Sequence, residues 1–348
     1  MTVIAPAALV FPHPEPPPFG ALTEIAPGVL WLRLSLPFLL DHVNVYLIED
    51  GAGWALLDTG IGDAATRAVW EALLAGPLRS RKLTRIIATH FHPDHMGLVG
   101  WLTHRFDLPL AMSQTEFLFT QTLRGNPEAV RSPQHQAFYR QRGLDEAALA
   151  DVVGRGHAYL ALTTGTPPVY QRLVAGEILH IGGRSFEVLT GGGHSPEQVM
   201  LLCRDDALFF AADQVLARIS PNISVWAWEP EANPLDAYLR SLADLRTILP
   251  QDALVLAAHN LPFIGLHQRA EELAHHHAER CAAIAAACAK TPMTAAEIVP
   301  VLFRRKLDSH ATGFAFGEVV AHLNFMRGRN ELVVEADSAG VQRVRSLA

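Results

Sequence analysis

Three imidazoles and one carboxylate fall within six positions of this sequence, in the run Thr89-His90-Phe91-His92-Pro93-Asp94-His95. Imidazole nitrogens and carboxylate oxygens together suit zinc, and first-row divalent metals more generally. The preceding residues, 83–89, form a short and mostly apolar run that predicts a buried strand, so the cluster lies on the loop that leaves a strand end. Ligands bind at such strand ends in open α/β folds. The sequence therefore predicts a metal site at this loop.

The residues within and after the cluster explain how it can bend. Pro93 blocks continuation of the strand because it has no backbone N–H. Asp94 can cap a helix that begins near His95, and Gly97 leaves room for close packing. Neighbouring side chains of such a bent segment can converge on one point instead of alternating across a sheet.

Three further candidate ligands follow other predicted strands. His194 comes after a strand that ends at Leu189 and after three glycines, which permit a sharp backbone turn. Asp213 and His259 follow the apolar runs 208–210 and 254–256. An isolated histidine at a strand end is usually a structural or surface residue, but the joint pattern indicates metal binding. The seven candidate ligands are His90, His92, Asp94, His95, His194, Asp213 and His259.

The elements that must position these residues form two strand-rich halves. A helix is predicted over 64–74, before the strand that leads into the cluster. The other predicted strands cover 28–36, 44–49, 54–58, 177–181, 185–189, 199–203 and 207–210. Two such halves with helices outside predict a mixed α/β (α+β) fold, a four-layer αββα sandwich.

Composition narrows the class of protein further. The 348 residues carry a net charge of −7 and no run of Lys or Arg, so nucleic acid is an unfavoured partner. The three cysteines are too few for a disulfide framework. Residues 1–24 form a proline-rich extension without the features of a signal peptide, and no apolar run is long enough to span a membrane. We expect a cytoplasmic protein without membrane association. The sequence leaves open whether the protein forms a homodimer.

The motifs and their order resemble the metallo-β-lactamase superfamily over roughly residues 25–265. The resemblance implies two metal sites, with His90, His92 and His194 in the first, Asp94, His95 and His259 in the second, and Asp213 bridging them. It also implies that Asp58, in the triplet Asp-Thr-Gly, orients a ligand histidine through a hydrogen bond. Two departures are visible. Gly192-Gly193-His194-Ser195-Pro196-Glu197 stands where Pro-Gly-His-Thr-Pro-Gly is usual, and Ala212 replaces the usual glycine before the bridging aspartate.

Two segments fall outside the repeating strand pattern. Residues 113–174 read as a mostly helical insertion or cap. Its aromatic and aliphatic residues could form an apolar wall for substrate or could pack the cap onto the sandwich: Phe117, Phe119, Phe138, Tyr139, Tyr159, Leu160 and Leu162. His157 is a further candidate for substrate contact.

Residues 266–348 predict a small C-terminal domain. Helices are predicted over 268–289, after the N-cap Thr294, and over 313–326, followed by a hairpin. This order resembles the winged-helix appendage of the lactamase-β2-like branch of the superfamily. The helix 313–326 carries apolar residues where a DNA-reading helix needs Arg, Lys, Asn or Gln, so we expect it to pack against the main domain. We expect the histidines 275–277 to form a solvated helix face, not a metal site.

The resemblance implies chemistry by two divalent metals about 3.5–4 Å apart that share a water molecule. Zinc is the favoured metal, with iron and manganese as alternatives. The metals would make hydroxide available near neutral pH to attack an acyl carbon, and Asp94 and Asp213 would hold the cations and accept the nucleophile's proton. We expect the substrate to be a small ester, thioester or lactone.

Other activities of this fold stay open as alternatives. One is a metal-dependent endoribonuclease of the lactamase-β2-like type, and another is a β-lactamase. A third is a mononuclear-iron persulfide oxygenase, whereas a di-iron redox protein of the superfamily has Glu where this chain has His92. A catalytically silent binding module would require the loss of ligands, and none is missing.

Overall fold

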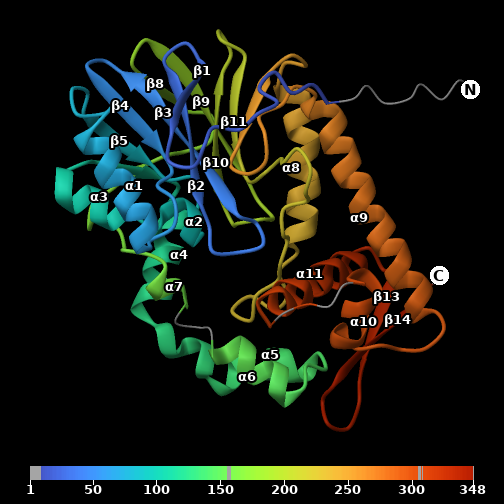
Figure 1. Ribbon diagram of the computed structural model, residues 1–348. Helices are drawn as coiled ribbons and strands as arrows, with labels where there is room; N and C mark the ends of the chain where they lie inside the picture. The colour runs from blue at the N-terminus through green and yellow to red at the C-terminus, as the bar shows by residue number, and fades with distance from the viewer. Residues whose placement is uncertain (1–8, 155–157, 305–306, 308, 348) are drawn as a thin grey trace, which may run out of the picture.

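The computed structural model describes residues 9–154, 158–304, 307 and 309–347. Two β-sheets face each other at the centre of the larger half of the molecule (Figure 1). The first sheet has its strands in chain order, and the first four pair antiparallel whereas β4 to β7 pair parallel. Its strands are β1 (Leu22–Ala26), β2 (Val29–Ser35), β3 (His42–Asp50), β4 (Gly53–Leu57), β5 (Leu83–Ile87), β6 (Leu110–Met112) and β7 (Gln171–Arg172).

The second sheet has the strand order β12-β11-β10-β9-β8. All of its pairs are antiparallel except β11 with β12. Its strands are β8 (Ile178–Ile181), β9 (Arg184–Gly191), β10 (Gln198–Cys203), β11 (Leu208–Ala212) and β12 (Leu254–Ala257).

Helices cover the outer face of each sheet and complete four layers. Trp70 in α1 (Ala64–Ala75) and Leu102 in α3 (Val99–Phe106) pack with the outward residues of the first sheet. α8 (Pro234–Ile248) and α9 (Leu266–Cys288) cover the second sheet (Figure 1). Alternation along β2 explains the layering, because Trp31 belongs to the core between the sheets and Leu32 to the core under α1. The predicted αββα sandwich is confirmed.

The sandwich differs from the prediction at its edges. β1 begins at Leu22, inside the predicted extension 1–24. β7 pairs with β6, so the end of the predicted insertion 113–174 belongs to the first sheet. The short helix α2 (Pro93–Met96) begins two residues before His95, which places Asp94 inside its first turn and not at its cap.

The segment between β6 and β7 is helical, as expected. It contains α4 (Gln114–Gly125), a 3₁₀ helix η1 (Pro127–Arg131), α5 (Pro133–Gln141), α6 (Glu146–Gly154) and α7 (Ala158–Ala161). The rings of Phe138 and Tyr139 on α5 lie 6.1 and 5.6 Å from the ring of Phe316 in the C-terminal part. The cap is therefore anchored to the C-terminal part as well as to the sandwich.

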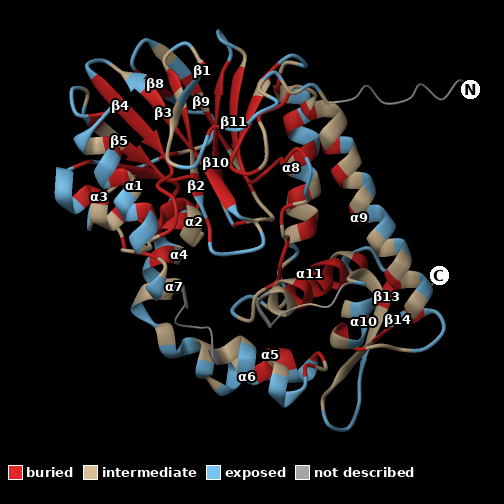
Figure 2. Cartoon of the chain, in the orientation of Figure 1, coloured by how far each residue is buried: buried red, intermediate tan, exposed pale blue. Residues whose placement is uncertain are grey.

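The C-terminal part consists of α10 (Ala295–Leu302), α11 (Ser309–Gly328) and a hairpin of β13 (Leu332–Ala336) and β14 (Gln342–Ser346). Thr294 and Glu297 form the predicted capping box at the start of α10. α11 is largely buried (Figure 2), and its Phe316, Val319 and Val320 join the same apolar core as α8 and α9. Within the residues that the structure describes, no helix combines the length and apolar character needed to cross a membrane.

Candidate metal centre

The structure brings all seven predicted ligand side chains to one edge of the sandwich, although they follow four different strands. Asp213 is central. Its Oδ2 lies 3.1 Å from His194 Nε2 and 3.5 Å from His95 Nε2, and its Oδ1 lies 3.4 Å from His259 Nε2. Asp94 Oδ2 also lies 3.4 Å from His259 Nε2. Candidate ligands as far apart in the sequence as His90 and His259 thus meet in one cluster.

The cluster divides into overlapping groups whose ligand atoms all lie within 4.8 Å of one another. The first group is His90, His92 and His194, and the second is Asp94, His95 and His259. A third group, His90, His95 and Asp213, joins them. This division is the one that the resemblance implies, with a carboxylate between two triads.

Hydrogen bonds from outside the cluster fix three of the imidazole rings. His95 Nδ1 lies 2.9 Å from Asp58 Oδ2, His194 Nδ1 lies 2.9 Å from the Asn222 carbonyl oxygen, and His259 Nδ1 lies 2.7 Å from the His42 carbonyl oxygen. In each pair the Nδ1–H donates, because the partner oxygen accepts. The lone pair of each Nε2 is therefore directed into the cluster, as a metal ligand requires.

Asp58 supports two rings at once. Besides His95, it accepts hydrogen bonds of 2.8 Å from the backbone N–H and from the Oγ1 of Thr89. The same hydroxyl lies 3.0 Å from His90 Nδ1, so it accepts from His90 and donates to Asp58. Asp58 adopts a φ of 62°, an unusual conformation for a residue other than glycine. The predicted orienting role fits this geometry.

The two segments that depart from the family pattern both keep a sharp bend before a ligand. In the first, the glycine of the usual pattern is retained as Gly193, which has a φ of 109°. A Cβ there would lie 2.5 Å from the Cβ of Tyr238, so this position requires glycine. Ala212 has a φ of 46°, in the left-handed region that glycine adopts most easily. Alanine here keeps the bend that aims Asp213, at the cost of some backbone strain.

The chemistry of the donor set fits a pair of divalent cations. His95 Nε2, His194 Nε2 and Asp213 Oδ1 are buried and have no hydrogen-bond partner. Buried polar groups without partners cost about 1–3 kcal/mol each, so such a cluster is stable only if something else satisfies it. Nitrogen and carboxylate oxygen ligands at these spacings would be satisfied by zinc or another first-row metal.

The charges within the cluster divide the histidines into two kinds. Burial lowers the pKa of His92 to about 3, and His194 beside it acts in the same direction. Burial would also lower the pKa of His259, but Asp213 and Asp94 outweigh it and raise the pKa to about 10. The carboxylates around His95 likewise raise its pKa well above 6.5. Positive charge is therefore most stable beside Asp94 and Asp213.

Glu116 on α4 is a buried residue of the site that sequence reasoning missed. Its Oε2 accepts a hydrogen bond of 2.9 Å from the Phe91 N–H, and its Oε1 accepts one of 2.7 Å from the Glu197 N–H. Burial raises its pKa to about 7, against these bonds. Glu116 thereby ties the loop of His90 and His92 to the loop that follows His194. A single glutamate in a polar helix gives no sequence signal for such a role.

A cavity of about 240 Å³ adjoins the cluster at His92. Its lining includes Tyr139 and Tyr159 of the cap, as predicted. The other five members of the predicted wall are not lining residues: Phe117, Phe119, Phe138, Leu160 and Leu162. Phe117 stacks on Tyr170 at 3.9 Å, and Phe138 packs in the core beside Phe316. His157 lies outside the described residues. The pattern also missed the lining residues Trp226, Trp228 and Phe314, which come from outside the cap.

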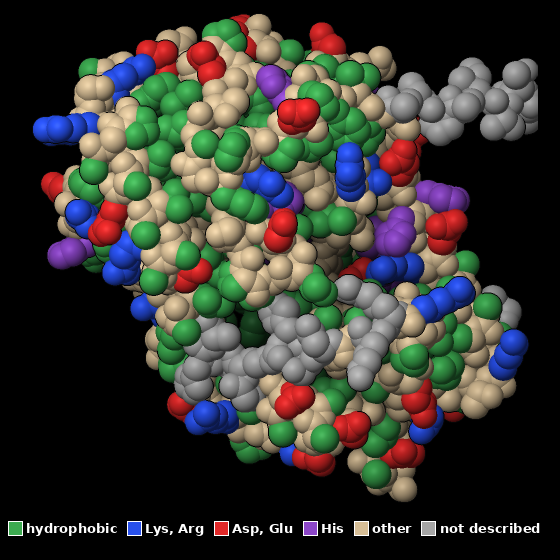
Figure 3. Space-filling view, in the orientation of Figure 1, with side chains coloured by type: hydrophobic (Ala, Val, Ile, Leu, Met, Phe, Trp, Pro, Cys, Tyr) green, Lys and Arg blue, Asp and Glu red, His purple; other side chains and the backbone are tan. Residues whose placement is uncertain are grey.

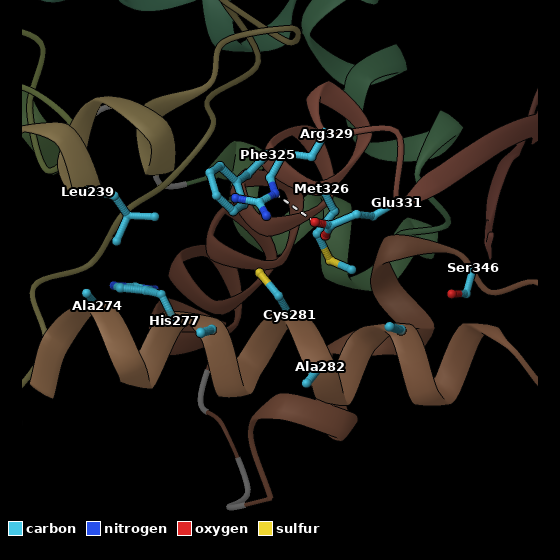
Figure 4. A pocket seen from close by; sticks show the side chains of 12 residues that line it. Leu239, Ala274, His277, Cys281, Ala282, Phe325, Met326, Arg329, Glu331 and Ser346 are labelled. Atoms are coloured by element: carbon cyan, nitrogen blue, oxygen red, sulfur yellow. Dashed lines mark hydrogen bonds and ion pairs between the residues drawn. The ribbon is translucent and has the colours of Figure 1, made fainter. Parts of the chain in front are cut away.

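A second cavity, of about 430 Å³, lies between α9 and the end of α11 (Figure 4). Its lining combines alanines of α9 with Phe325, Met326 and the hydrogen-bonded pair Arg329 and Glu331. It contains none of the seven candidate ligands, so it is separate from the metal centre.

His277, which borders this second cavity, is fully buried. The prediction of a solvated face holds for the exposed His275 and is wrong for His277. His322 donates from Nδ1 to the Glu318 carbonyl oxygen, so its Nε2 accepts from His277 Nδ1 at 3.1 Å. The Glu318 carboxylate accepts hydrogen bonds from the side chains of Arg280 and Asn222. These bonds make the group a structural network that joins α9 to α11.

Two family models match the chain. The model of the metallo-beta-lactamase superfamily matches residues 39–259, and the model of the metallo-beta-lactamase-like C-terminal domain matches residues 281–347. Because the first match covers more than half of the 348 residues, the chain belongs to the metallo-beta-lactamase superfamily.

Individual relatives agree with this assignment. A beta-lactamase domain protein from Burkholderia ambifaria has a solved structure that is 39% identical, with a TM-score of 0.90, over 97% of this chain and 98% of that chain. The probable metallo-hydrolase YqjP of Bacillus subtilis is 22% identical over 87% of this chain and 93% of its own length. An atrochrysone carboxyl ACP thioesterase of Aspergillus fumigatus is 22% identical over 60% of this chain and 48% of its own length. The chain is a metal-dependent hydrolase of this superfamily.

Proposed function

We propose that this protein is a dinuclear metal hydrolase that cleaves small esters, thioesters or lactones with an uncharged acyl group. One observation carries the proposal: the apolar cavity beside His92 opens next to the cluster of seven converging ligands. A group bound in that cavity would have its carbonyl carbon close to the cluster.

The candidate ligands have distinct roles in this proposal. His90, His92 and His194 would hold one metal, Asp94, His95 and His259 the other, and Asp213 would contact both. Bound divalent metals would act as Lewis acids that polarise a carbonyl and bring the pKa of water near neutrality. Asp94 has 20% of its side chain exposed, against 7% for Asp213. Asp94 is therefore the carboxylate better placed to accept a proton at the open side of the site.

The relatives support an acyl substrate only in outline. The thioesterase relative cleaves an acyl group from a carrier according to its name, and it matches 60% of this chain. Its identity of 22% over about half of its own length leaves the acyl group of this chain to be argued from the cavity.

An endoribonuclease is the weaker candidate. On the face shown in Figure 3, Lys and Arg side chains alternate with Asp and Glu, without a continuous basic track. Among the described residues that line the cavity beside His92, none is Lys or Arg. Affinity for a polyanionic chain depends on several such contacts, so the described surface favours a small neutral substrate.

The proposal is tested by metal content and by substrate comparison on one preparation. Elemental analysis is expected to find two metals per chain, with zinc favoured. Aryl esters, acyl thioesters and lactones are expected to have a higher kcat/KM than β-lactams or single-stranded RNA, and His92→Ala is expected to abolish all of these activities. One tightly bound iron with oxygen consumption on a persulfide would overturn the hydrolase proposal. A β-lactam or RNA turned over at least tenfold better than every ester would overturn the substrate class.

A further inference from the structure

The cavity beside His92 is assembled from four separate parts of the chain. The metal loop contributes Phe91 and His92, and the helical cap between β6 and β7 contributes several residues, among them His135 on α5. The segment between β11 and α8 contributes Trp228, and α11 contributes Phe314. Because α11 belongs to the C-terminal part, the cavity is complete only in the whole chain. We call this cavity the aromatic pocket.

Aromatic rings of the pocket lining are linked to one another by ring contacts. Phe119, which is not itself a lining residue, connects Phe91 to Trp228, with ring centroids 4.7 Å and 5.3 Å away. Trp228 and Trp226 are nearly parallel, with centroids 5.5 Å apart and 18° between the planes. Trp226 then meets Phe314 edge-on at 5.9 Å. Such a set of rings offers both faces and edges to another flat ring.

The described lining of the aromatic pocket favours uncharged groups. Its described lining contains no Asp, Glu, Lys or Arg. Burial lowers the pKa of His135, so this imidazole is neutral at neutral pH. The hydroxyl of Tyr159 already donates to the Phe91 carbonyl oxygen at 2.8 Å. A charged group placed here would lose its hydration without gaining an ionic partner among the described lining residues.

The size of the aromatic pocket and its place limit what it can hold. Its volume of about 240 Å³ is below the range of about 300–1,000 Å³ typical of sites for whole drug-sized ligands. His92 belongs both to the pocket lining and to the candidate ligand cluster. A single group would therefore fill the pocket, with its carbonyl toward the cluster and the leaving group outside the pocket.

We infer that the aromatic pocket selects an uncharged, planar aromatic acyl group, with Trp228 and Phe314 as the residues that determine this specificity. The inference rests on the proposed hydrolase function and names its substrate class. Trp228 lines the aromatic pocket and has 42% of its surface exposed, so it is accessible to a substrate ring. Aromatic contacts of this kind discriminate a flat ring from a saturated one of similar volume.

The first experiment compares 4-nitrophenyl esters that differ only in the acyl group: 2-naphthoyl, benzoyl, cyclohexanecarbonyl and acetyl. On the wild-type chain the aromatic acyl groups are expected to exceed cyclohexanecarbonyl by about tenfold or more in kcat/KM. Trp228→Ala is expected to lower the naphthoyl value by about 10–100-fold and to change the acetyl value by less than about threefold. Trp228→Phe keeps a flat ring and is expected to retain most of the naphthoyl activity.

Trp101 on α3 provides a matched control, because it is a partly exposed tryptophan that does not line the aromatic pocket. Trp101→Ala is expected to leave the ratio of naphthoyl to acetyl hydrolysis unchanged. Equal rates for naphthoyl and cyclohexanecarbonyl esters, or an unchanged ratio in Trp228→Ala, would overturn the inference while leaving the hydrolase function intact.

A binding experiment separates the two proposals. 2-Acetonaphthone carries the naphthoyl group but has no bond to hydrolyse, and its binding can be followed by calorimetry. We expect it to bind the wild-type chain and Trp228→Phe and to bind Trp228→Ala at least about tenfold more weakly. This result without hydrolysis of any ester would retain the aromatic pocket and reject the proposed function. Equal affinity for wild type and Trp228→Ala would reject the pocket.

Discussion

At the scale of single residues, the arrangement of the candidate ligands depends on residues that are not ligands themselves. Asp58 is the clearest case, because one carboxylate holds His95 directly and His90 through the Thr89 hydroxyl. Asp58→Asn replaces one acceptor oxygen by an N–H donor that faces the His95 Nδ1–H or the Thr89 donors. We expect metal affinity or activity to fall by roughly 10–100-fold with little change in fold.

Metal affinity measured by chelator competition, with circular dichroism as the measure of folding, checks this prediction. Asp63→Asn is a suitable control, because Asp63 caps α1 and is not one of the cluster's partners. Wild-type metal affinity and turnover in Asp58→Asn would make Asp58 an ordinary residue at a strand end.

A second residue prediction concerns the pH dependence of stability. Burial lowers the pKa of His277 to about 2 and that of His322 to about 4, so both rings are neutral in the folded chain. The unfolded chain takes up these protons near pH 6.5, so their contribution to stability is complete above pH 6.5 and is lost as the pH falls below it. Each histidine would cost about 1.4 kcal/mol per pH unit in that range.

His277→Gln removes one of these protons but keeps an N–H donor for His322. Its melting temperature is expected to fall less steeply than that of the wild type between pH 6 and pH 4.5. His275→Gln changes an exposed histidine on the same helix and is expected to follow the wild-type slope. Parallel curves for wild type and His277→Gln would contradict the prediction.

Single residues also show the limit of prediction from sequence. The local run from His90 to His95 was recognisable because metal ligands crowd a short segment after an apolar strand. His277 was misjudged, because three adjacent histidines point in three directions and only the packing of α9 on α11 selects which one is buried. Trp228 was missed because a tryptophan in a loop gives no periodic signal and its neighbours come from distant segments.

At the scale of elements, α11 connects the C-terminal part to the metal centre. The Asn222 carbonyl oxygen orients His194, and the Asn222 side chain donates to Glu318 on α11 at 3.1 Å. Gly317 on α11 lets Ser224 approach closely, since a Cβ there would lie 2.8 Å from the Ser224 hydroxyl. The loop that carries Asn222 is thus fixed by a helix about 90 residues further along the chain.

Asn222→Ala is expected to loosen this loop and weaken the retention of the metal held by His194 by roughly tenfold, whereas the other metal is retained better. Asn222→Asp is expected to be worse, because a carboxylate would face the carboxylate of Glu318. The rate and stoichiometry of metal release to a chelator measure both effects. Release of both metals at wild-type rates from Asn222→Ala would show that α11 does not support the centre.

At the scale of the whole molecule, the sandwich and the C-terminal part share one apolar core. Phe209 of β11, Leu273 of α9 and Phe316 of α11 belong to the same buried cluster. The sequence predicted the C-terminal helices and the hairpin from capping and alternation, but it gave no measure of this shared burial, which depends on contacts between distant segments. The sequence alone therefore indicates that residues 266–348 are a separable domain. In the structure their apolar side chains cover the second sheet.

Deletion of residues 266–348 is expected to expose this core and to yield aggregated protein. Size-exclusion chromatography and the yield of soluble protein measure the outcome. A truncated chain that is monomeric and folds cooperatively would contradict the prediction. Salt-dependent binding of duplex DNA by the full chain that disappears on truncation would show that residues 266–348 bind DNA.

The hydrogen bond from His259 Nδ1 to the His42 carbonyl oxygen joins residues 217 positions apart. The four ligands between His90 and His95, by contrast, leave the ribosome together and early. Each of the three groups that contain these ligands nevertheless needs His194, Asp213 or His259, so none is complete until the second half of the chain has been synthesised. If the unfolded chain binds the cation through the local run, the metal would contribute less to folding stability than its final affinity would give.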